Sequence, residues 1–378
     1  MTQTAATECP PLDRASSLSF DGVIVVDSSV REQRSLKGLG VENFEKEQEM
    51  REGIVGRRRE KSVMVVMEGT LAKKPLEACC YLRRKLKSLM ESENQMKIMY
   101  VCHVTPAFES ATEFSLPLTF FDIIWLKFPP VERIFFYKLT ELSPSFFNSV
   151  ILPNLKHSLS HALLHFLPLA GNLTWPPQAT KPILLYTPND GVELTVAESN
   201  ADFHHLSGNG VREALESRLC IPELPVTDSK ASVIALKITL FPKQGFCIGI
   251  SSHHGIMDGK SSTMFIKAWA HICKLSGREK QQHPDLLPEL TPFFDRTDIQ
   301  DPEGLEMVYL NNWLEHKWPG SDPNPRSMKL LPALAVPVRA TFELSGEDIK
   351  KLRTRLSQKG WKVAEWFLWH LQQIAEPV

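Results

Sequence analysis

The stretch GISSHHGIMDGKSS, residues 249–262, joins an apolar strand to a helix. The residues before the histidines follow the pattern of a strand, and residues 260–275 carry apolar side chains at helical spacing. Side chains at such a strand-to-helix turn project from a rigid frame into a cleft. This stretch therefore predicts a functional site within an α/β fold.

The residue types at this turn suit proton transfer. Two histidines, His253 and His254, are followed by Asp258 and then by Gly259. A histidine here is suited to proton abstraction near neutral pH, because the unperturbed imidazole has a pKa of about 6.5. Asp258 can fold back onto the loop and fix its shape. Gly259 permits a backbone angle that other residues resist, and so allows a tight turn.

Three other interpretations of these residues stay open. The two histidines can be packed loop residues whose polar atoms are satisfied by the backbone. His253, His254 and Asp258 can be metal ligands, although no further Cys, His or Glu cluster lies nearby to complete a coordination shell. A nucleophile triad would use one of the nearby serines, none of which lies in a nucleophile-elbow motif: Ser251, Ser252 or Ser261. The apolar strand that leads into the histidines favours the catalytic interpretation.

The chain from residue 97 onward follows a mixed α/β pattern. Apolar and alternating runs predict strands at 97–104, 133–139, 183–186, 192–197, 232–241 and 245–251. Apolar residues at helical spacing predict helices at 119–125, 144–165, 211–219 and 260–275. We therefore expect one mixed-sheet domain over residues 97–276, with the histidine motif inside it.

The sequence on either side of this domain has a different character. Residues 1–96 include a segment, 31–61, that is roughly half charged, and we expect an atypical, disordered extension, although the pattern permits a strand at 62–67 and a helix at 76–90. Residues 277–337 are rich in proline with few sustained periods, which predicts an extended crossover segment. Residues 338–378 predict a strand at 338–344 and helices at 346–356 and 363–374.

The composition is that of a soluble globular protein. Hydrophobic residues make up 43% of the 378 residues, charged residues 23%, and the net charge is −1. This charge gives no field that would steer the chain to nucleic acid or to an anionic membrane. The seven cysteines are scattered, the N-terminus has no signal-peptide core, and no apolar run approaches the ~18–20 residues of a membrane span. We therefore expect a cytoplasmic protein with reduced thiols.

Several segments between residues 97 and 345 carry a family resemblance. They are LPLTFFDIIW at 116–125, FLPLAGNLTW at 166–175, PNDGVELTVA at 188–197 with Asp202-Phe203, HGIMDG at 254–259, and FDRT at 294–297 with Asp301-Pro302. In this order they resemble the plant BAHD acyltransferase family, most of all its phenolic glucoside and anthocyanin malonyltransferase branch. The motif HHxxxDG alone also occurs in chloramphenicol acetyltransferases and peptide-synthetase condensation domains, so the ordered set is more specific than the motif.

The resemblance implies a chloramphenicol acetyltransferase-like fold and a CoA-dependent acyl transfer. His254 would be the general base that takes a proton from an acceptor hydroxyl, which then attacks the thioester carbonyl of an acyl-CoA. Malonyl-CoA is the first candidate donor and an aromatic acyl-CoA the second, with a phenolic glycoside as acceptor. Asp258 would hold the loop in shape, and Gly259 would be structural. The resemblance implies no bound cofactor and no metal, and we expect a monomer.

The family has a second domain of similar fold, with DFGWG and YFGNC segments that do not occur in these 378 residues. We therefore expect residues 338–378 to be a fragment of that domain with a divergent tail. An alternative function follows, that of a truncated and catalytically inactive relative that at most binds a partner or small ligand. We also expect the chain expressed alone to be poorly soluble or inactive, because an uncovered interface would expose a large apolar patch.

Overall fold

The structure is a computed structural model. It describes residues 63–69, 96–107, 112–208, 212–276, 286–315, 321–332 and 338–344, together with the single positions 347, 350, 351 and 354. The predicted helices at 76–90 and 363–374, most of the one at 346–356, and most of the predicted extension at 1–96 lie outside the described residues.

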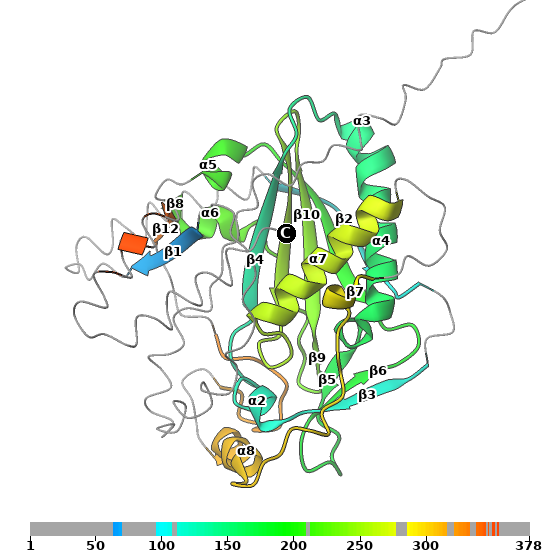
Figure 1. Ribbon diagram of the computed structural model, residues 1–378, viewed down its shortest axis with the longest axis vertical. Helices are drawn as coiled ribbons and strands as arrows, with labels where there is room; N and C mark the ends of the chain where they lie inside the picture. Colours follow the sequence, from blue (N-terminus) through cyan, green and yellow to red (C-terminus); the bar gives the residue numbers. More distant parts are fainter. Residues whose placement is uncertain are drawn as a thin grey trace, which may run out of the picture.

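Five strands form the central sheet in the order β2, β7, β10, β11, β4 (Figure 1). Their bounds are β2 Met96–Val104, β7 Val192–Ser199, β10 Ile234–Phe241, β11 Gly245–Ser252 and β4 Val131–Lys138. Strands β7 and β10 pair in parallel, and the other three pairs are antiparallel. The mixed α/β sheet predicted from the sequence is confirmed, and each of its five strands lies within two or so residues of the expected range.

Two long helices lie side by side on one face of this sheet (Figure 1). The predicted helix at 144–165 is a continuous run of α3 Pro144–Phe146, a π-helical turn at Phe147–Ile151 and α4 Leu152–His165. Helix α7, Gly259–Ser276, runs beside α4. The Trp269 indole N–H on α7 joins the two helices, since it donates to the Ser158 hydroxyl at 3.0 Å and lies 3.2 Å from the Leu155 carbonyl oxygen. These contacts fix α7 against α4, and α7 begins seven residues after the end of β11.

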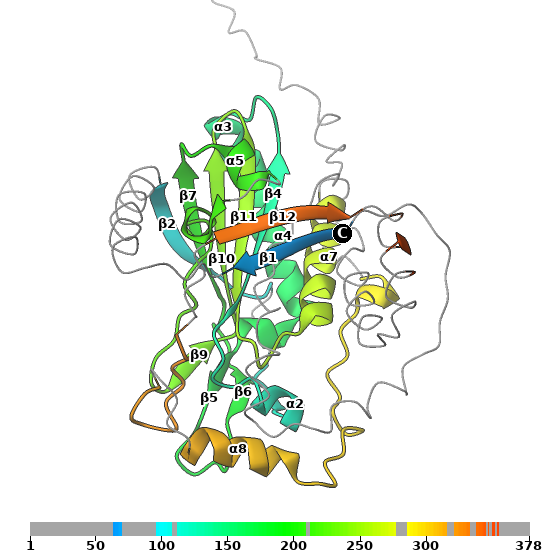
Figure 2. The same cartoon turned by 90° about the vertical axis from the view of Figure 1, so that its left-hand side faces the viewer.

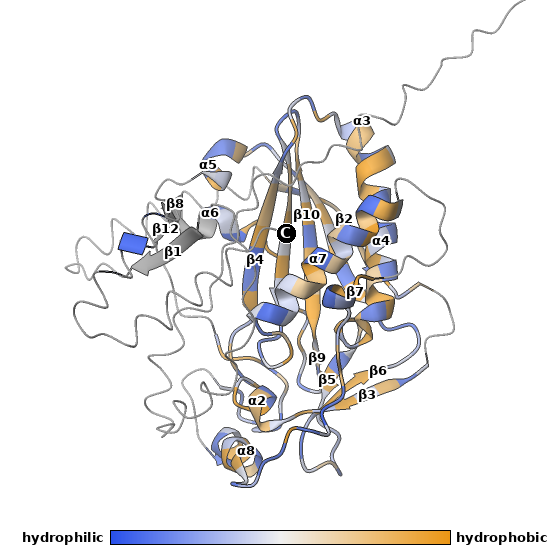
Figure 3. Ribbon diagram, viewed as in Figure 1, coloured by the Kyte–Doolittle hydropathy of each residue, from blue (hydrophilic) through white to orange (hydrophobic). Residues whose placement is uncertain are grey.

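Two smaller sheets complete the described strands. One has the order β3, β6, β5, β9, with bounds β3 Phe114–Pro117, β6 Ile183–Tyr186, β5 Asn172–Thr174 and β9 Lys230–Ser232. It lies below the central sheet in the view of Figure 3, where β3 and β6 are coloured as mostly hydrophobic. The other has the order β1, β12, β8, with bounds β1 Val63–Gly69, β12 Val338–Leu344 and β8 Arg212–Glu213. Strands β1 and β12 are seen side by side in Figure 2.

Two comparisons with the sequence prediction concern these outer elements. Strand β1 falls inside residues 1–96 and overlaps the strand that the pattern permits at 62–67, whereas most of the predicted disordered extension lies outside the described residues. The helix predicted at 211–219 is shorter, because β8 at Arg212–Glu213 pairs with β12 and α6 begins only at Ala214, ending at Arg218. Strand β8 forms by pairing with β12, which is more than a hundred residues away in the sequence, so the local periodicity of residues 211–219 does not predict it. The remaining short helix on this side is α5, Phe203–Ser207.

The crossover segment, residues 277–337, contains more regular structure than its sequence predicts. A 3₁₀ turn spans Pro288–Leu290, and helix α8 spans Leu305–Glu315. The Asp301 carboxylate starts α8 by accepting the backbone N–H groups of Leu305 and Glu306, each at 2.8 Å. No helix in the described residues is long and apolar enough to cross a membrane.

Candidate active site

The histidine motif forms the turn between β11 and α7. Strand β11 ends at Ser252, and the His253 N–H donates to the Val233 carbonyl at 2.8 Å, one residue before β10 begins. The chain then turns tightly, since the N–H of Ile256 donates back to the His253 carbonyl at 3.1 Å. The motif therefore sits at the end of two fully buried central strands, which is the rigid frame that the sequence predicts.

His253 is enclosed by the protein. Its side chain has no exposed surface, and its Nδ1 accepts the Gly255 backbone N–H at 3.2 Å. Burial lowers the pKa of His253 to about 3, with smaller contributions from His254 and Lys127. The imidazole is therefore neutral and carries its proton on Nε2, because Nδ1 is occupied as an acceptor. A substrate in solution cannot reach this side chain.

His254 has a different environment, because it is only partly buried. Its imidazole stacks on the Trp125 indole, with ring centroids 4.2 Å apart and planes 12° from parallel. The Phe128 ring lies further away, at 6.2 Å and 58°. Trp125 and Phe128 both come from the segment between helix α2, Phe120–Ile123, and strand β4. Of the two neighbouring histidines, His254 is the one with some exposed surface, although both of its ring nitrogens are buried.

Asp258 caps the helix that follows the turn. Its carboxylate accepts the Ser261 backbone N–H at 2.6 Å, and its carbonyl accepts the Ser262 N–H at 3.0 Å. A side-chain acceptor at this position satisfies a backbone donor that has no partner within the helix. The side chain is exposed. The contact fixes the first turn of α7, and the wider role expected of Asp258 in the shape of the loop stays a prediction.

The conformational reason expected for Gly259 is wrong. The described glycines with positive φ are Gly245 and Gly304, and a Cβ added to Gly259 would have no heavy atom within 4 Å. Gly259 is simply the first residue of α7, where the backbone has helical angles. The crowded glycine of the motif is Gly255, at which a Cβ would lie 2.9 Å from the Asp122 carbonyl oxygen and 3.4 Å from the His253 ring.

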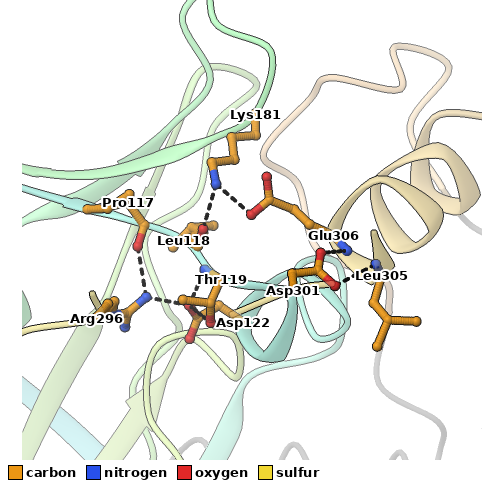
Figure 4. A network of polar contacts seen from close by, with 9 residues as sticks. All are labelled: Pro117, Leu118, Thr119, Asp122, Lys181, Arg296, Asp301, Leu305 and Glu306. Atoms are coloured by element: carbon orange, nitrogen blue, oxygen red, sulfur yellow. Dashed lines mark hydrogen bonds and ion pairs between the residues drawn. The ribbon is translucent and has the colours of Figure 1, made fainter. Parts of the chain in front are cut away.

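Helix α2 lies against the turn at Asp122, whose own polar contacts are drawn in Figure 4. The Asp122 carboxylate accepts the Thr119 N–H at 2.7 Å and the Thr119 hydroxyl at 2.9 Å, and it forms an ion pair with Arg296 of the crossover segment. Arg296 also donates to the Pro117 carbonyl at 2.9 Å. Burial raises the pKa of Asp122, and the Arg296 charge opposes that shift. The crossover segment thus holds the helix whose backbone contacts Gly255.

A second clamp joins the crossover segment to the same region (Figure 4). The Lys181 ammonium donates to the Leu118 carbonyl at 2.8 Å and pairs with Glu306, at the start of α8, at 2.6 Å. The Trp313 indole N–H, further along α8, donates to the Ile123 carbonyl at 2.7 Å. Helices α2 and α8 are therefore tied together at both ends.

Lys127 is a buried cation whose charge acts on His253. Its side chain is 8% exposed, and burial lowers its pKa to about 8, with the Asp322 charge acting in the opposite direction. Its backbone carbonyl accepts the Leu331 N–H at 2.8 Å, so residues 321–332 also pack here. A positive charge at this place disfavours protonation of His253.

The alternative interpretations of the motif fare differently: His253 is a packed loop histidine that binds the backbone, as the first of them has it, and the other two concern the serines and a metal ion. Ser251 and Ser252 are each 1% exposed, and the Ser261 N–H is bound to the helix cap. Within the part of the chain that the structure describes, His, Cys, Asp and Glu do not gather in any group of three or more that could hold a metal ion. The cysteines in these ranges are free thiols, namely Cys102, Cys220, Cys247 and Cys273.

Sequence reasoning placed His254, Asp258 and Gly259 together, and the turn does bring them into one short stretch. It did not identify Trp125, Lys127 or the role of Arg296. Trp125 and Arg296 both lie in segments that carry the family resemblance, at 116–125 and 294–297. Their partners, His254 and Asp122, are more than a hundred residues away in the sequence, and no local pattern predicts these contacts.

Comparison with known proteins gives one family and several relatives. Residues 95–362 match the model of the Transferase family. Phenolic glucoside malonyltransferase 1 of Arabidopsis thaliana is 47% identical over 279 residues, which cover 71% of this chain and 58% of that protein. The malonyl-CoA:anthocyanidin 5-O-glucoside-6''-O-malonyltransferase of the same plant is 44% identical over 274 residues, covering 71% and 57%.

Among solved structures, vinorine synthase is similar with a TM-score of 0.40 and 22% identity, over 53% of this chain and 46% of that one. The chain thus spans less than two thirds of the length of the relatives that it matches.

Proposed function

The chain belongs to the Transferase family, the BAHD acyltransferases, and on that premise we propose that it carries the general base for acyl transfer from an acyl-CoA to a hydroxyl of a phenolic glycoside. His254 is that base. Malonyl-CoA is the first candidate donor, because the two curated relatives described above are named as malonyltransferases, and an aromatic acyl-CoA is the second.

The observation that carries this proposal is the difference between the two neighbouring histidines. His253 is fully buried and kept neutral, whereas His254 is partly exposed against an aromatic ring. General base catalysis needs an imidazole that is accessible to the hydroxyl and held in a defined orientation. The stack on Trp125 supplies the orientation, and the ring nitrogens of His254, which are buried in this structure, must become accessible when the acceptor binds.

The reaction needs no covalent acyl-enzyme. His254 takes the proton of the acceptor hydroxyl while the oxygen attacks the thioester carbonyl carbon, which gives a tetrahedral oxyanion. The carbon–sulfur bond then breaks, the acyl group stays on the acceptor oxygen, and the proton passes from the imidazolium to the CoA thiolate. Asp258 contributes by fixing the start of α7, and Gly255 by allowing the turn to lie against helix α2.

We further propose the organisation that the sequence suggests. Residues 97–276 form the acyltransferase domain with the HxxxD motif, 277–337 form the crossover, and 338–378 belong to a second domain; the matched relatives are longer than the matched part, which covers 58% and 57% of their length. Residues 1–96 are an atypical extension. We propose a monomer that acts in the cytoplasm on small molecules, with acyl-CoA as co-substrate and no resident metal or cofactor.

The test compares the chain with a completed version. In the completed version, the chain is joined after β12, at Leu344, to the corresponding C-terminal part of phenolic glucoside malonyltransferase 1 of Arabidopsis thaliana. Both proteins are incubated with malonyl-CoA or an aromatic acyl-CoA and a phenolic glucoside, and CoA release and acylated product are measured. We expect the completed protein to form malonylated product. A folded chimera that binds acyl-CoA without turnover would favour the inactive-relative alternative, and one that neither binds nor reacts would contradict the proposal.

A further inference from the structure

We propose that Trp125 is a positioning residue for His254, and that its indole ring fixes the plane in which the imidazole takes up a proton. This inference rests on the proposed function, because it assigns His254 the role of base. Trp125 does not react with substrate. It acts through the histidine that it contacts.

The contact between the two rings is close and nearly parallel. Centroids 4.2 Å apart and planes 12° from parallel describe stacking over the faces of the imidazole and the indole. Such a contact covers a face of the imidazole and does not itself involve the nitrogen lone pairs and N–H bonds, because these lie in the ring plane at its edge. Rotation of the imidazole out of this plane about its last side-chain bond would break the stack. The stack therefore selects the plane of the ring, in which both nitrogens lie.

The indole can act as a reference plane because it is itself fixed. The Trp125 backbone N–H donates to the Asp122 carbonyl at 3.1 Å, and the Phe128 ring packs edge-on against the indole, with centroids 5.0 Å apart at 65°. Phe128 in turn packs at 89° against Trp313 of helix α8. These edge-to-face contacts favour one arrangement of the aromatic side chains.

The Trp125 segment is also tied to the crossover segment. The Trp313 indole N–H donates to the Ile123 carbonyl at 2.7 Å, and the ion pair between Arg296 and Asp122 holds the helix that precedes Trp125. The plane of the base is thus set by residues from helix α2, the segment before β4, and the crossover segment. Small errors in the placement of a catalytic group are costly, because a displacement of about 1 Å can lower turnover by about 100-fold.

The first test uses the 378-residue chain and needs no turnover. Ring protons of His254 lie over an indole face in this structure, so their NMR signals are shifted upfield by its ring current. The signals are assigned by their loss in His254→Gln. We expect Trp125→Leu to move them downfield toward an ordinary histidine position, and Trp125→Phe to leave them at an intermediate position. The matched control is Trp175→Leu, since the Trp175 indole contacts Ala179 and Arg326 instead, and it should leave the His254 signals unchanged.

The second test measures kinetics in the completed protein described above. Trp125→Leu should lower kcat by about 10- to 100-fold with KM little changed, and Trp125→Phe, which restores a flat ring, should recover most of kcat. Melting temperatures of the two variants show whether both are folded. If Trp125→Leu is unfolded, the NMR test is decided by Trp125→Phe, whose His254 signals should lie at the intermediate position.

The outcomes separate this inference from the function on which it rests. If His254→Ala abolishes turnover while Trp125→Leu keeps the wild-type kcat, the function stands and the positioning role is contradicted. If His254→Ala retains turnover, the proposed function itself fails. His254 signals that are not shifted upfield, or that do not respond to Trp125→Leu, contradict the stacking on which the inference depends.

Discussion

Two neighbouring residues of one type, His253 and His254, differ in burial and in contacts. His253 is fully buried, and its Nδ1 holds the turn through Gly255, whereas His254 is partly buried and stacks against Trp125. Sequence alone offers both side chains as candidates for the base. Burial distinguishes them.

The buried histidine should make the fold sensitive to acid. The pKa of His253 is about 6.5 in the unfolded chain and about 3 in the folded protein, so the unfolded state binds the extra proton between these values. Stability is therefore fully present above pH 6.5 and is lost as the pH falls toward 3, with a slope of about 1.4 kcal/mol per pH unit from this residue.

The matched variant is His253→Asn, whose side-chain oxygen can still accept the Gly255 N–H but does not titrate. We expect urea unfolding between pH 7 and pH 3.5 to show a steeper loss of stability in the wild type than in the variant. Parallel curves for the two proteins would show that His253 is not held neutral by the fold.

The cap at Asp258 predicts a contrast between two substitutions. Asp258→Ala removes the acceptor for the Ser261 N–H and should lower the free energy of unfolding by about 1 kcal/mol. Asp258→Asn keeps a side-chain oxygen of the same length, so its loss should be clearly smaller. Chemical denaturation at pH 7 measures both. An asparagine variant as unstable as the alanine variant would indicate that the charge of Asp258, and not its capping hydrogen bond, stabilises the turn.

At the scale of elements, the crossover segment contacts helix α2, and helix α2 contacts the histidine turn between β11 and α7. Arg296 pairs with Asp122, whose pKa is raised by burial, and the two side chains are 20% and 15% exposed. Arg296→Met leaves that carboxylate without its cation and should lower the free energy of unfolding by about 2 kcal/mol.

The companion variant is the double substitution Arg296→Met with Asp122→Asn, in which no charge is left unpaired. We expect it to be more stable than Arg296→Met alone, as measured by urea unfolding. If the free energy of unfolding lost in the double variant equals the sum of the losses from Arg296→Met alone and Asp122→Asn alone, the pair does not couple the crossover segment to α2.

Local patterns predicted the elements that have strong periodicity and missed those that depend on distant partners. The central strands and the helices at 144–165 and 260–275 were predictable because their apolar residues repeat at a clear period. Helix α8 was not, because its apolar side chains form no single stripe and only Leu310 and Trp313 are buried, the latter by contact with α2. The stacking of Trp125 on His254 joins residues 129 positions apart in the sequence, and no local pattern encodes it.

At the scale of the whole molecule, the edge of the central sheet carries an apolar surface. Strand β2 is the last in the described strand order, and its residues 98–101 are all more than 40% exposed, namely Ile98, Met99, Tyr100 and Val101. Exposed apolar strands at a sheet edge promote pairing between chains.

We therefore expect Ile98→Lys to reduce self-association of the purified 378-residue chain, as measured by sedimentation velocity at several concentrations. The control is Phe146→Lys, which places the same charge at a 46% exposed apolar residue of helix α3. An equal effect of the two substitutions would show that added charge is responsible and that the β2 edge has no special role.

The central claim is that His254 is the general base. The most direct measurement is the turnover of malonyl-CoA and a phenolic glucoside by the completed protein, with wild-type, His254→Ala and His253→Asn forms compared at equal folded concentration. We predict that His254→Ala lowers kcat by about 10²–10⁴-fold with the melting temperature unchanged, while His253→Asn retains most of the activity. Near-normal turnover in His254→Ala would contradict the account.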